Sequence, residues 1–140
     1  MIHDTPFFRY GNPRFDGKHI GDCYIRSVVF ATGMDYEAVD MLFQVKMEEL
    51  GAKHPNDLCV IMKVLSDLGF EFVETLNYRD TGSMKIRTFL KSNKGKYILK
   101  GKEHMAYAEN GKVIDTWDCT NHMLFEYWRR KGEKDDRFTS

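Results

Sequence analysis

The sequence has few cysteines, no excess of charge and no long apolar run, and each absence excludes a class of protein. Three cysteines in 140 residues make no disulfide framework, and the odd count fits a reducing compartment such as the cytoplasm. Basic and acidic residues number 21 each, so the zero net charge gives no general attraction to nucleic acid or to an anionic membrane. No run of about 18 apolar residues is present to span a membrane, and residues 1–18 lack the apolar core of a secretion signal. We therefore expect a cytoplasmic protein with neither nucleic acid nor membrane as a partner.

The composition suits one domain over residues 1–140, and it leaves the oligomeric state open. Hydrophobic residues make up 42% and aromatic residues 14%, which is enough for a single core. Residues 1–20 hold two of the three prolines and show no sustained periodicity, so we expect an irregular segment lying across the surface. The charged residues 129–140 are expected to fray.

Helical patterns fill the first half of the chain. Apolar spacing predicts helices from Cys23 to Gly33, from Tyr36 to Leu50 and from Asn56 to Gly69. The Asp22 carboxylate is expected to cap the first of them, because it can accept from free amides in the first turn. A short helix over 84–90, capped by Ser83, is also expected.

Strand patterns fill the second half. They are expected over 70–73, 96–99, 103–109 and 112–117, and residues 122–129 favour either a strand or a helix. Asn110-Gly111 separates two of these runs, which is the strongest short hairpin signal because both turn residues need a positive φ. The predicted fold is α+β, with an N-terminal helical part packed on a C-terminal antiparallel sheet.

The hairpin register brings two polar residues together. With Asn110-Gly111 as the turn, His104 lies opposite Trp117, and Asp115 lies diagonal to His104 on the same face. Diagonal neighbours are about 7–8 Å apart at the backbone, within reach of two polar side chains. Asp118 points to the other face unless the strand ends at Trp117, so Asp115 is the first choice as a partner of His104 and Asp118 the second.

A cysteine at a helix start and a histidine on a hairpin suit a thiol nucleophile. Free amides and the dipole at the helix N-terminus stabilise a thiolate at Cys23. The His104 imidazole can take the thiol proton and later protonate a leaving group. A third polar group, Asp115, must then hold the other imidazole nitrogen.

The same segments resemble a known family. GDCYIRS (21–27), ATG (31–33) and DYEAV (35–39) look like the start of small papain-like cysteine peptidases, closest to the phage-encoded C39-peptidase-like group. GKYIL (95–99), HMA (104–106) and GKVIDTWD (111–118) resemble the second half of that group. The resemblance implies a papain-like fold, a peptide or protein substrate and no cofactor. It makes Cys23 the nucleophile, His104 the base and Asp115 the orienter, with Trp117 shielding their hydrogen bond.

The family's oxyanion-donor glutamine has no counterpart here. Its position, six residues before Cys23, holds Gly17, and Asn12 is the only upstream side-chain amide, at a spacing that does not match. This departure leaves an alternative function, a catalytically weak or inactive papain-like module that binds a partner, such as a phage accessory protein in the host cytoplasm.

A zinc-stapled domain is a minor alternative. Two cysteine–histidine pairs could supply a tetrahedral ligand set from His19, Cys23, Cys119 and His122. Neither pair has a familiar finger spacing, so we expect no metal ion. Cys119 otherwise suits a turn or a partly exposed position, and Cys59 suits the core. The sequence leaves open whether Arg26 contacts the site.

Overall fold

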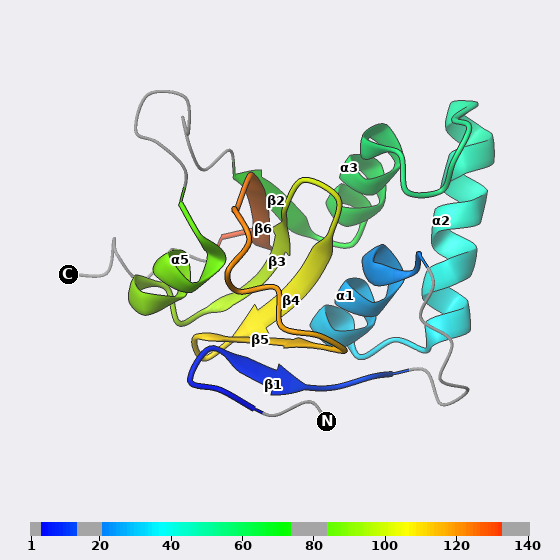
Figure 1. Ribbon diagram of the computed structural model, residues 1–140. Helices are drawn as coiled ribbons and strands as arrows, with labels where there is room; N and C mark the ends of the chain where they lie inside the picture. The colour runs from blue at the N-terminus through cyan, green and yellow to red at the C-terminus, as the bar shows by residue number, and fades with distance from the viewer. Residues whose placement is uncertain (1–3, 14–20, 74–83, 133–140) are drawn as a thin grey trace.

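The computed structural model describes residues 4–13, 21–73 and 84–132, and these form an α+β fold with helices packed on a mixed sheet (Figure 1). The sheet has six strands in the order β1-β5-β4-β3-β6-β2. In chain order, the helices and strands of the protein are β1 (Phe8–Tyr10), α1 (Cys23–Thr32), α2 (Tyr36–Leu50), α3 (Leu58–Asp67), β2 (Phe70–Val73), α5 (Ile86–Ser92), β3 (Lys96–Lys100), β4 (Met105–Glu109), β5 (Lys112–Asp115) and β6 (Glu126–Arg130). No helix in the described part of the chain is long and apolar enough to cross a membrane.

The helix predictions agree closely with the structure. α2 has the predicted bounds, and both α1 and α2 end at a left-handed glycine, Gly33 and Gly51. α3 begins at Leu58 rather than Asn56, and α5 begins at Ile86 rather than at residue 84. The predicted cap Ser83 lies outside the described residues. The Asp22 side chain makes no capping hydrogen bond, because its carboxylate is turned to other partners described below.

The expectation that residues 1–20 are irregular is wrong for β1. This strand pairs in parallel with β5, with Phe8 opposite Val113, so the sheet is mixed rather than wholly antiparallel. Phe8 is fully buried, and the Val113 amide donates to the Phe7 carbonyl at 2.8 Å. Burial of this aromatic side chain stabilises the strand. A parallel pair is not joined by a tight turn, so no turn signal in the sequence indicates the strand.

The expected fraying from residue 129 is also wrong for its first residues. β6 lies between β3 and β2, and Arg129 and Arg130 are paired with Glu71 and Phe70. The aromatic residues of β6 supply the reason, because Tyr127 and Trp128 are almost fully buried on opposite faces of the sheet. Residues 133–140 lie outside the described part.

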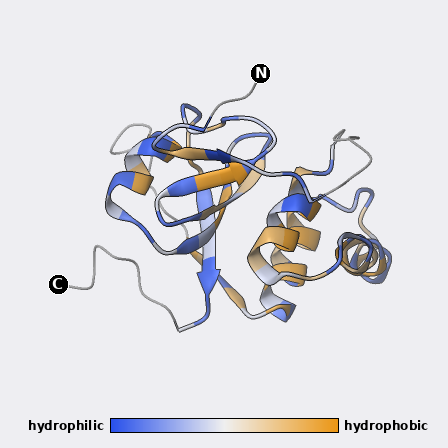
Figure 2. Cartoon of the chain, turned by 90° about the horizontal axis from the view of Figure 1, so that it is seen from below, coloured by the Kyte–Doolittle hydropathy of each residue, from blue (hydrophilic) through white to orange (hydrophobic). Residues whose placement is uncertain are grey.

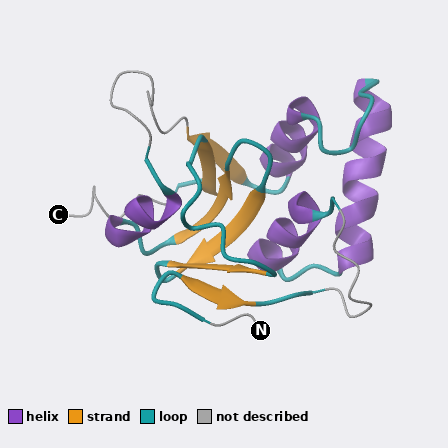
Figure 3. Ribbon diagram, viewed as in Figure 1, coloured by secondary structure: helices purple, strands orange, loops and turns teal. Residues whose placement is uncertain are grey.

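The sheet separates two apolar clusters, one on each face. Helices α1 and α3 pack on one face, against residues such as Tyr107 and Trp128, and α2 packs on these two helices from outside. Helix α5 covers the other face and packs on residues such as Leu99 and Ala106. Figure 3 shows the two helical layers on either side of the strands, and Figure 2 shows the hydrophobic residues along the central strands and helices.

The β4–β5 hairpin has the predicted turn and register. Asn110 and Gly111 both have positive φ, 53° and 80°. Tyr107 pairs with Ile114 and Glu109 with Lys112, as the turn requires. The ladder is shorter than predicted, however, because β4 begins at Met105 and β5 ends at Asp115. His104 and Trp117 therefore lie just beyond the paired strands, where their side chains are freer to turn.

Candidate active site

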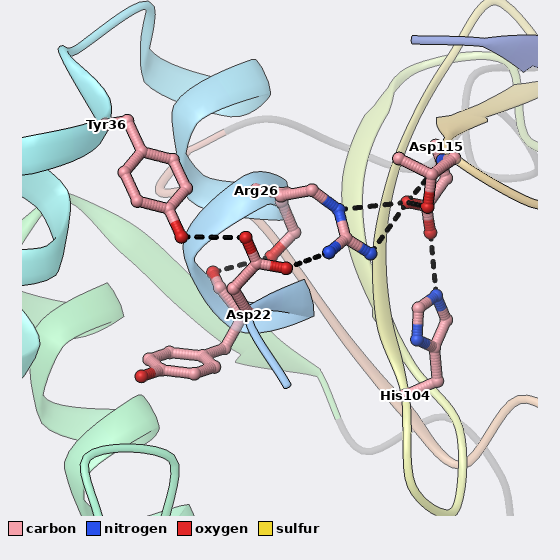
Figure 4. Close-up of polar contacts among 8 residues, drawn as sticks. Asp22, Arg26, Tyr36, His104 and Asp115 are labelled. Atoms are coloured by element: carbon pink, nitrogen blue, oxygen red, sulfur yellow. Dashed lines mark hydrogen bonds and ion pairs between the residues drawn. The ribbon is translucent and has the colours of Figure 1, made fainter. Parts of the chain in front are cut away.

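Three residues singled out from the sequence lie at ends of secondary structure. Cys23 is the first residue of α1, His104 immediately precedes β4, and Asp115 is the last residue of β5. His104 and Asp115 lie where the β4–β5 ladder ends, and Cys23 lies where α1 begins, so none of the three is fixed by pairing within the ladder on both sides. Figure 4 shows His104 and Asp115 in contact, with Arg26 reaching the same carboxylate from α1.

Asp115 is the partner of His104. The imidazole Nε2 hydrogen-bonds to Asp115 Oδ2 at 2.7 Å, and the carboxylate is only 2% exposed. The second oxygen, Oδ1, accepts from the Thr116 amide at 2.7 Å and from Arg26 Nη2 at 3.1 Å. Burial alone would raise the pKa of Asp115. The hydrogen bond and charge of His104, the Thr116 amide and the Arg26 charge all favour the charged carboxylate, and together they lower the pKa of Asp115 below its ordinary value. Asp115 therefore stays ionised and fixes the imidazole.

Cys23 hydrogen-bonds to the His104 side chain. Burial raises the pKa of the thiol, but the hydrogen bond and charge of His104, the Met105 amide and the Arg26 charge outweigh it, so the pKa is lowered. For His104, burial lowers the pKa, and hydrogen bonds to Asp115, Cys119 and Cys23 raise it above its ordinary value. The two shifts have opposite directions, and together they favour a thiolate beside an imidazolium.

Arg26 ties the helix to the hairpin, a role that the sequence left open. Its guanidinium is 3% exposed and bridges Asp22, one helical turn earlier, to Asp115. The Tyr36 hydroxyl donates to the second oxygen of Asp22 at 2.7 Å. Asp22 is therefore held by Arg26 and Tyr36 instead of capping α1. In the sequence, the spacing of four residues between Asp22 and Arg26 indicates the ion pair between these two residues, because side chains four apart are neighbours on a helix.

Trp117 lies against His104 as the register predicted. The ring centroids are 4.6 Å apart with the planes tilted, and the indole is 38% exposed. The indole also meets His122 in a T-shaped arrangement, with ring centroids 5.2 Å apart. Asp118, the second choice as orienter, instead accepts from the amide and hydroxyl of Thr120 at 2.9 and 2.6 Å. Asp118 is thus engaged in its own turn, and Asp115 alone of the two contacts His104.

Asn12, the upstream amide weighed as a donor, follows a residue that is anchored beside the site. The Gly11 amide donates to the Asp115 carbonyl at 2.9 Å, and Asn12 itself is half-buried. Gly17, at the position of the family's glutamine, lies outside the described residues. The structure thus places the residue before Asn12 against the backbone of Asp115.

The other two cysteines agree with their predicted environments only in part. Cys59 is exposed on α3 rather than in the core, because that helix turns its opposite side to the sheet. Cys119 begins a turn, as one of its two predicted settings has it, because the His122 amide donates to its carbonyl at 2.9 Å. It is only 1% exposed, however, and it hydrogen-bonds to His104. Burial raises the pKa of the Cys119 thiol, and the opposing effect of His104 does not reverse this. Nothing local in the sequence marked the proximity of Cys119 to His104.

A metal ion would find a different ligand set from the one weighed on spacing. Among the described residues, donor atoms of His104, Asp115 and Cys119 lie within 4.8 Å of one another. These are residue types that zinc uses. An ion there would have to displace the 2.7 Å bond between His104 and Asp115. His19 lies outside the described part of the chain, and His122 is not in this group.

A cavity of about 240 Å³ opens beside the thiol. Cys23 and His104 both line it, together with Tyr24 and Asn56. Asn56 comes from the connection between α2 and α3, far from Cys23 in the sequence, and no motif indicated it. A substrate carbonyl placed in this cavity would share it with Cys23, His104 and Asn56.

No protein-family model, curated protein or solved structure matches this chain. What the site does is therefore inferred from its own side chains and their contacts.

Proposed function

We propose that the protein is a papain-like thiol hydrolase that cleaves an amide or peptide bond through Cys23, His104 and Asp115. The observation that carries this proposal is the position of His104, which bridges the half-buried Cys23 thiol and the buried Asp115 carboxylate. A nucleophile, a base and an orienting group in that order are what covalent acyl transfer needs. A peptide or protein in the cytoplasm is the proposed substrate.

The chemistry proceeds in two steps. In the first, the Cys23 thiolate attacks the carbonyl carbon, the C–N bond breaks, and the departing amine takes the proton held by His104. In the second, water attacks the resulting thioester and gives one proton to His104 as the C–S bond breaks. The product acid leaves, and Cys23 and His104 return to their starting state. Asp115 keeps its bond to Nε2 throughout and so directs the other nitrogen to the reacting atoms.

The carbonyl oxygen becomes negative during attack and needs donors. The amide of Cys23 is one of the first free amides of α1, which the helix dipole makes favourable for an anion. The Asn56 carboxamide, which lines the same cavity, is the proposed side-chain donor in place of the family's glutamine. One such donor is typically worth about 10²–10³ in rate.

The test is acylation by an activated ester. The p-nitrophenyl ester of N-acetylglycine is mixed with the protein at pH 7, and intact mass and peptide mapping follow the acyl group. We expect a thioester at Cys23, a burst of nitrophenol, and loss of both in Cys23→Ala.

Cys59→Ala is the matched control, since it removes an exposed thiol that lines neither of the two cavities described for this protein. It should leave the burst unchanged. A thioester on Cys59 in place of Cys23, or no acyl-protein at all, would contradict the proposal, and the second outcome would favour a binding module.

A further inference from the structure

A second and larger cavity begins at the same imidazole. It has a volume of about 480 Å³, and it shares Lys102, Glu103 and His104 with the smaller cavity beside Cys23. Ligand pockets usually enclose about 300–1,000 Å³, so the larger cavity has the size of a binding site. Cys23 lines only the smaller cavity, whereas Trp117 and Cys119 line only the larger one. His104 therefore stands at the border between two compartments.

The larger cavity is mainly apolar. Leu99 and Ala106 contribute its floor from the sheet face that carries α5, and Ile86 comes from the start of that helix. Met123 and Phe125 contribute another wall from the connection between β5 and β6. The charged side chains of Lys102 and Glu103 are exposed where the cavity meets the 101–104 turn, and His122 adds a polar ring beside Met123.

Backbone hydrogen bonds hold these walls in place. The Phe125 amide donates to the Lys100 carbonyl at 2.9 Å, and the Ile86 amide donates to the His122 carbonyl at 2.9 Å. The Gly101 amide donates to the His104 carbonyl at 2.8 Å, which closes the turn that carries the imidazole. The segments that form the cavity walls are thus tied to one another by backbone hydrogen bonds.

We infer that this cavity binds the side chain on the amine side of the scissile bond, and that the preferred substrate has a bulky apolar residue there. The inference rests on the proposed function and specifies its substrate. The acyl half of the substrate becomes bonded to Cys23 and must stay in the smaller cavity. The amine half receives its proton from His104 and so leaves from the imidazole, where the larger cavity begins. The apolar walls remove water from a side chain next to that nitrogen. This desolvation favours an aliphatic or aromatic side chain and disfavours a charged one.

Partitioning of the acyl-enzyme between water and added amines tests this directly. Cys23 is acylated by the N-acetylglycine ester in the presence of phenylalaninamide or glycinamide at equal concentration. An amine that occupies the larger cavity attacks the thioester by the reverse of the first step, and the C–S bond breaks as the C–N bond forms. The ratio of amide product to hydrolysis product should be roughly tenfold to a hundredfold higher for phenylalaninamide, the range typical of apolar discrimination.

Ala106→Leu, which fills the cavity floor, should bring the two amines close to equal. The matched control is Ala38→Leu on the exposed side of α2, which should keep the preference. Phe125→Ala removes an apolar wall instead of adding bulk, and it should also weaken the preference. This variant replaces Ala106→Leu in the test if the leucine variant does not fold.

Each failure has its own signature. Acylation of Cys23 with equal partitioning to both amines in the unmodified protein would overturn the assignment of the cavity and leave the hydrolase proposal standing. The cavity assignment is likewise overturned if Ala38→Leu lowers the preference as much as Ala106→Leu does. Absence of any acyl-enzyme would overturn both the hydrolase and the cavity assignment.

Discussion

His104→Ala is expected to lower turnover of the activated ester at pH 7 by about 10²–10⁴-fold, the usual contribution of a positioned acid–base group. The substitution removes the hydrogen bond and the charge that lower the pKa of the Cys23 thiol, while the burial that raises this pKa remains. Less thiolate is then present at neutral pH, and no group is left to carry the proton. The initial rate of nitrophenol release measures the effect.

His54→Ala is the matched control for that substitution. His54 is exposed on the connection between α2 and α3, and its side chain is not among those lining either cavity. Its loss should leave turnover unchanged. Free imidazole added to the His104→Ala protein should restore part of the rate, which it would not do if the substitution had merely disturbed the fold. Equal rates for the two alanine variants would remove His104 from the mechanism.

Arg26→Ala is expected to destabilise the fold by about 3–5 kcal/mol, because it leaves buried carboxylates without their shared cation. Arg26 lies between Asp22 and Asp115, and all three side chains are at least nine-tenths buried. The free energy of unfolding in urea at pH 7 measures the loss. This pH is far above 3.8, the ordinary pKa of an aspartate, so both carboxylates are charged in the unfolded chain.

Arg129→Ala supplies the comparison, since Arg129 forms a half-exposed pair with Glu71 at 2.7 Å. Exposed pairs contribute about 0–1 kcal/mol, so this variant should stay close to the unmodified protein. The lowered pKa of Asp115 means that its stabilising contribution is present above its unfolded value of 3.8 and is lost as the pH falls. The Arg26→Ala penalty should accordingly shrink in acid. A penalty at pH 7 no larger than that of Arg129→Ala would contradict the bridging role.

Local signals in the sequence were enough for the hairpin and for most helices. Asn110 and Gly111 must both adopt positive φ, and that single requirement fixed the β4–β5 register and the meeting of His104 with Asp115. The α2 helix was predictable to the residue, because its ends coincide with Asp35 and Gly51.

Contacts between distant segments were beyond the same reasoning. The β1 strand is three residues long and pairs in parallel with a strand more than one hundred residues later, so no turn announces it. The approach of Cys119 to His104 depends on how the connection after β5 folds back. The reach of Arg26 to Asp115 depends on how α1 packs on the hairpin. These features belong to tertiary packing, which periodicity and spacing do not encode.

The central claim, a thiolate at Cys23 paired with an imidazolium at His104, is tested most directly by the pH dependence of alkylation. Iodoacetamide and mass spectrometry give separate rates for Cys23, Cys59 and Cys119. The lowered pKa of Cys23 predicts rapid alkylation at pH values well below 9.0, the ordinary pKa of a cysteine thiol. The raised pKa of buried Cys119 predicts slow alkylation of that residue over the same pH range. In His104→Ala the Cys23 profile should move to higher pH. A Cys23 profile centred near 9.0 that is the same with and without His104 would contradict the pairing.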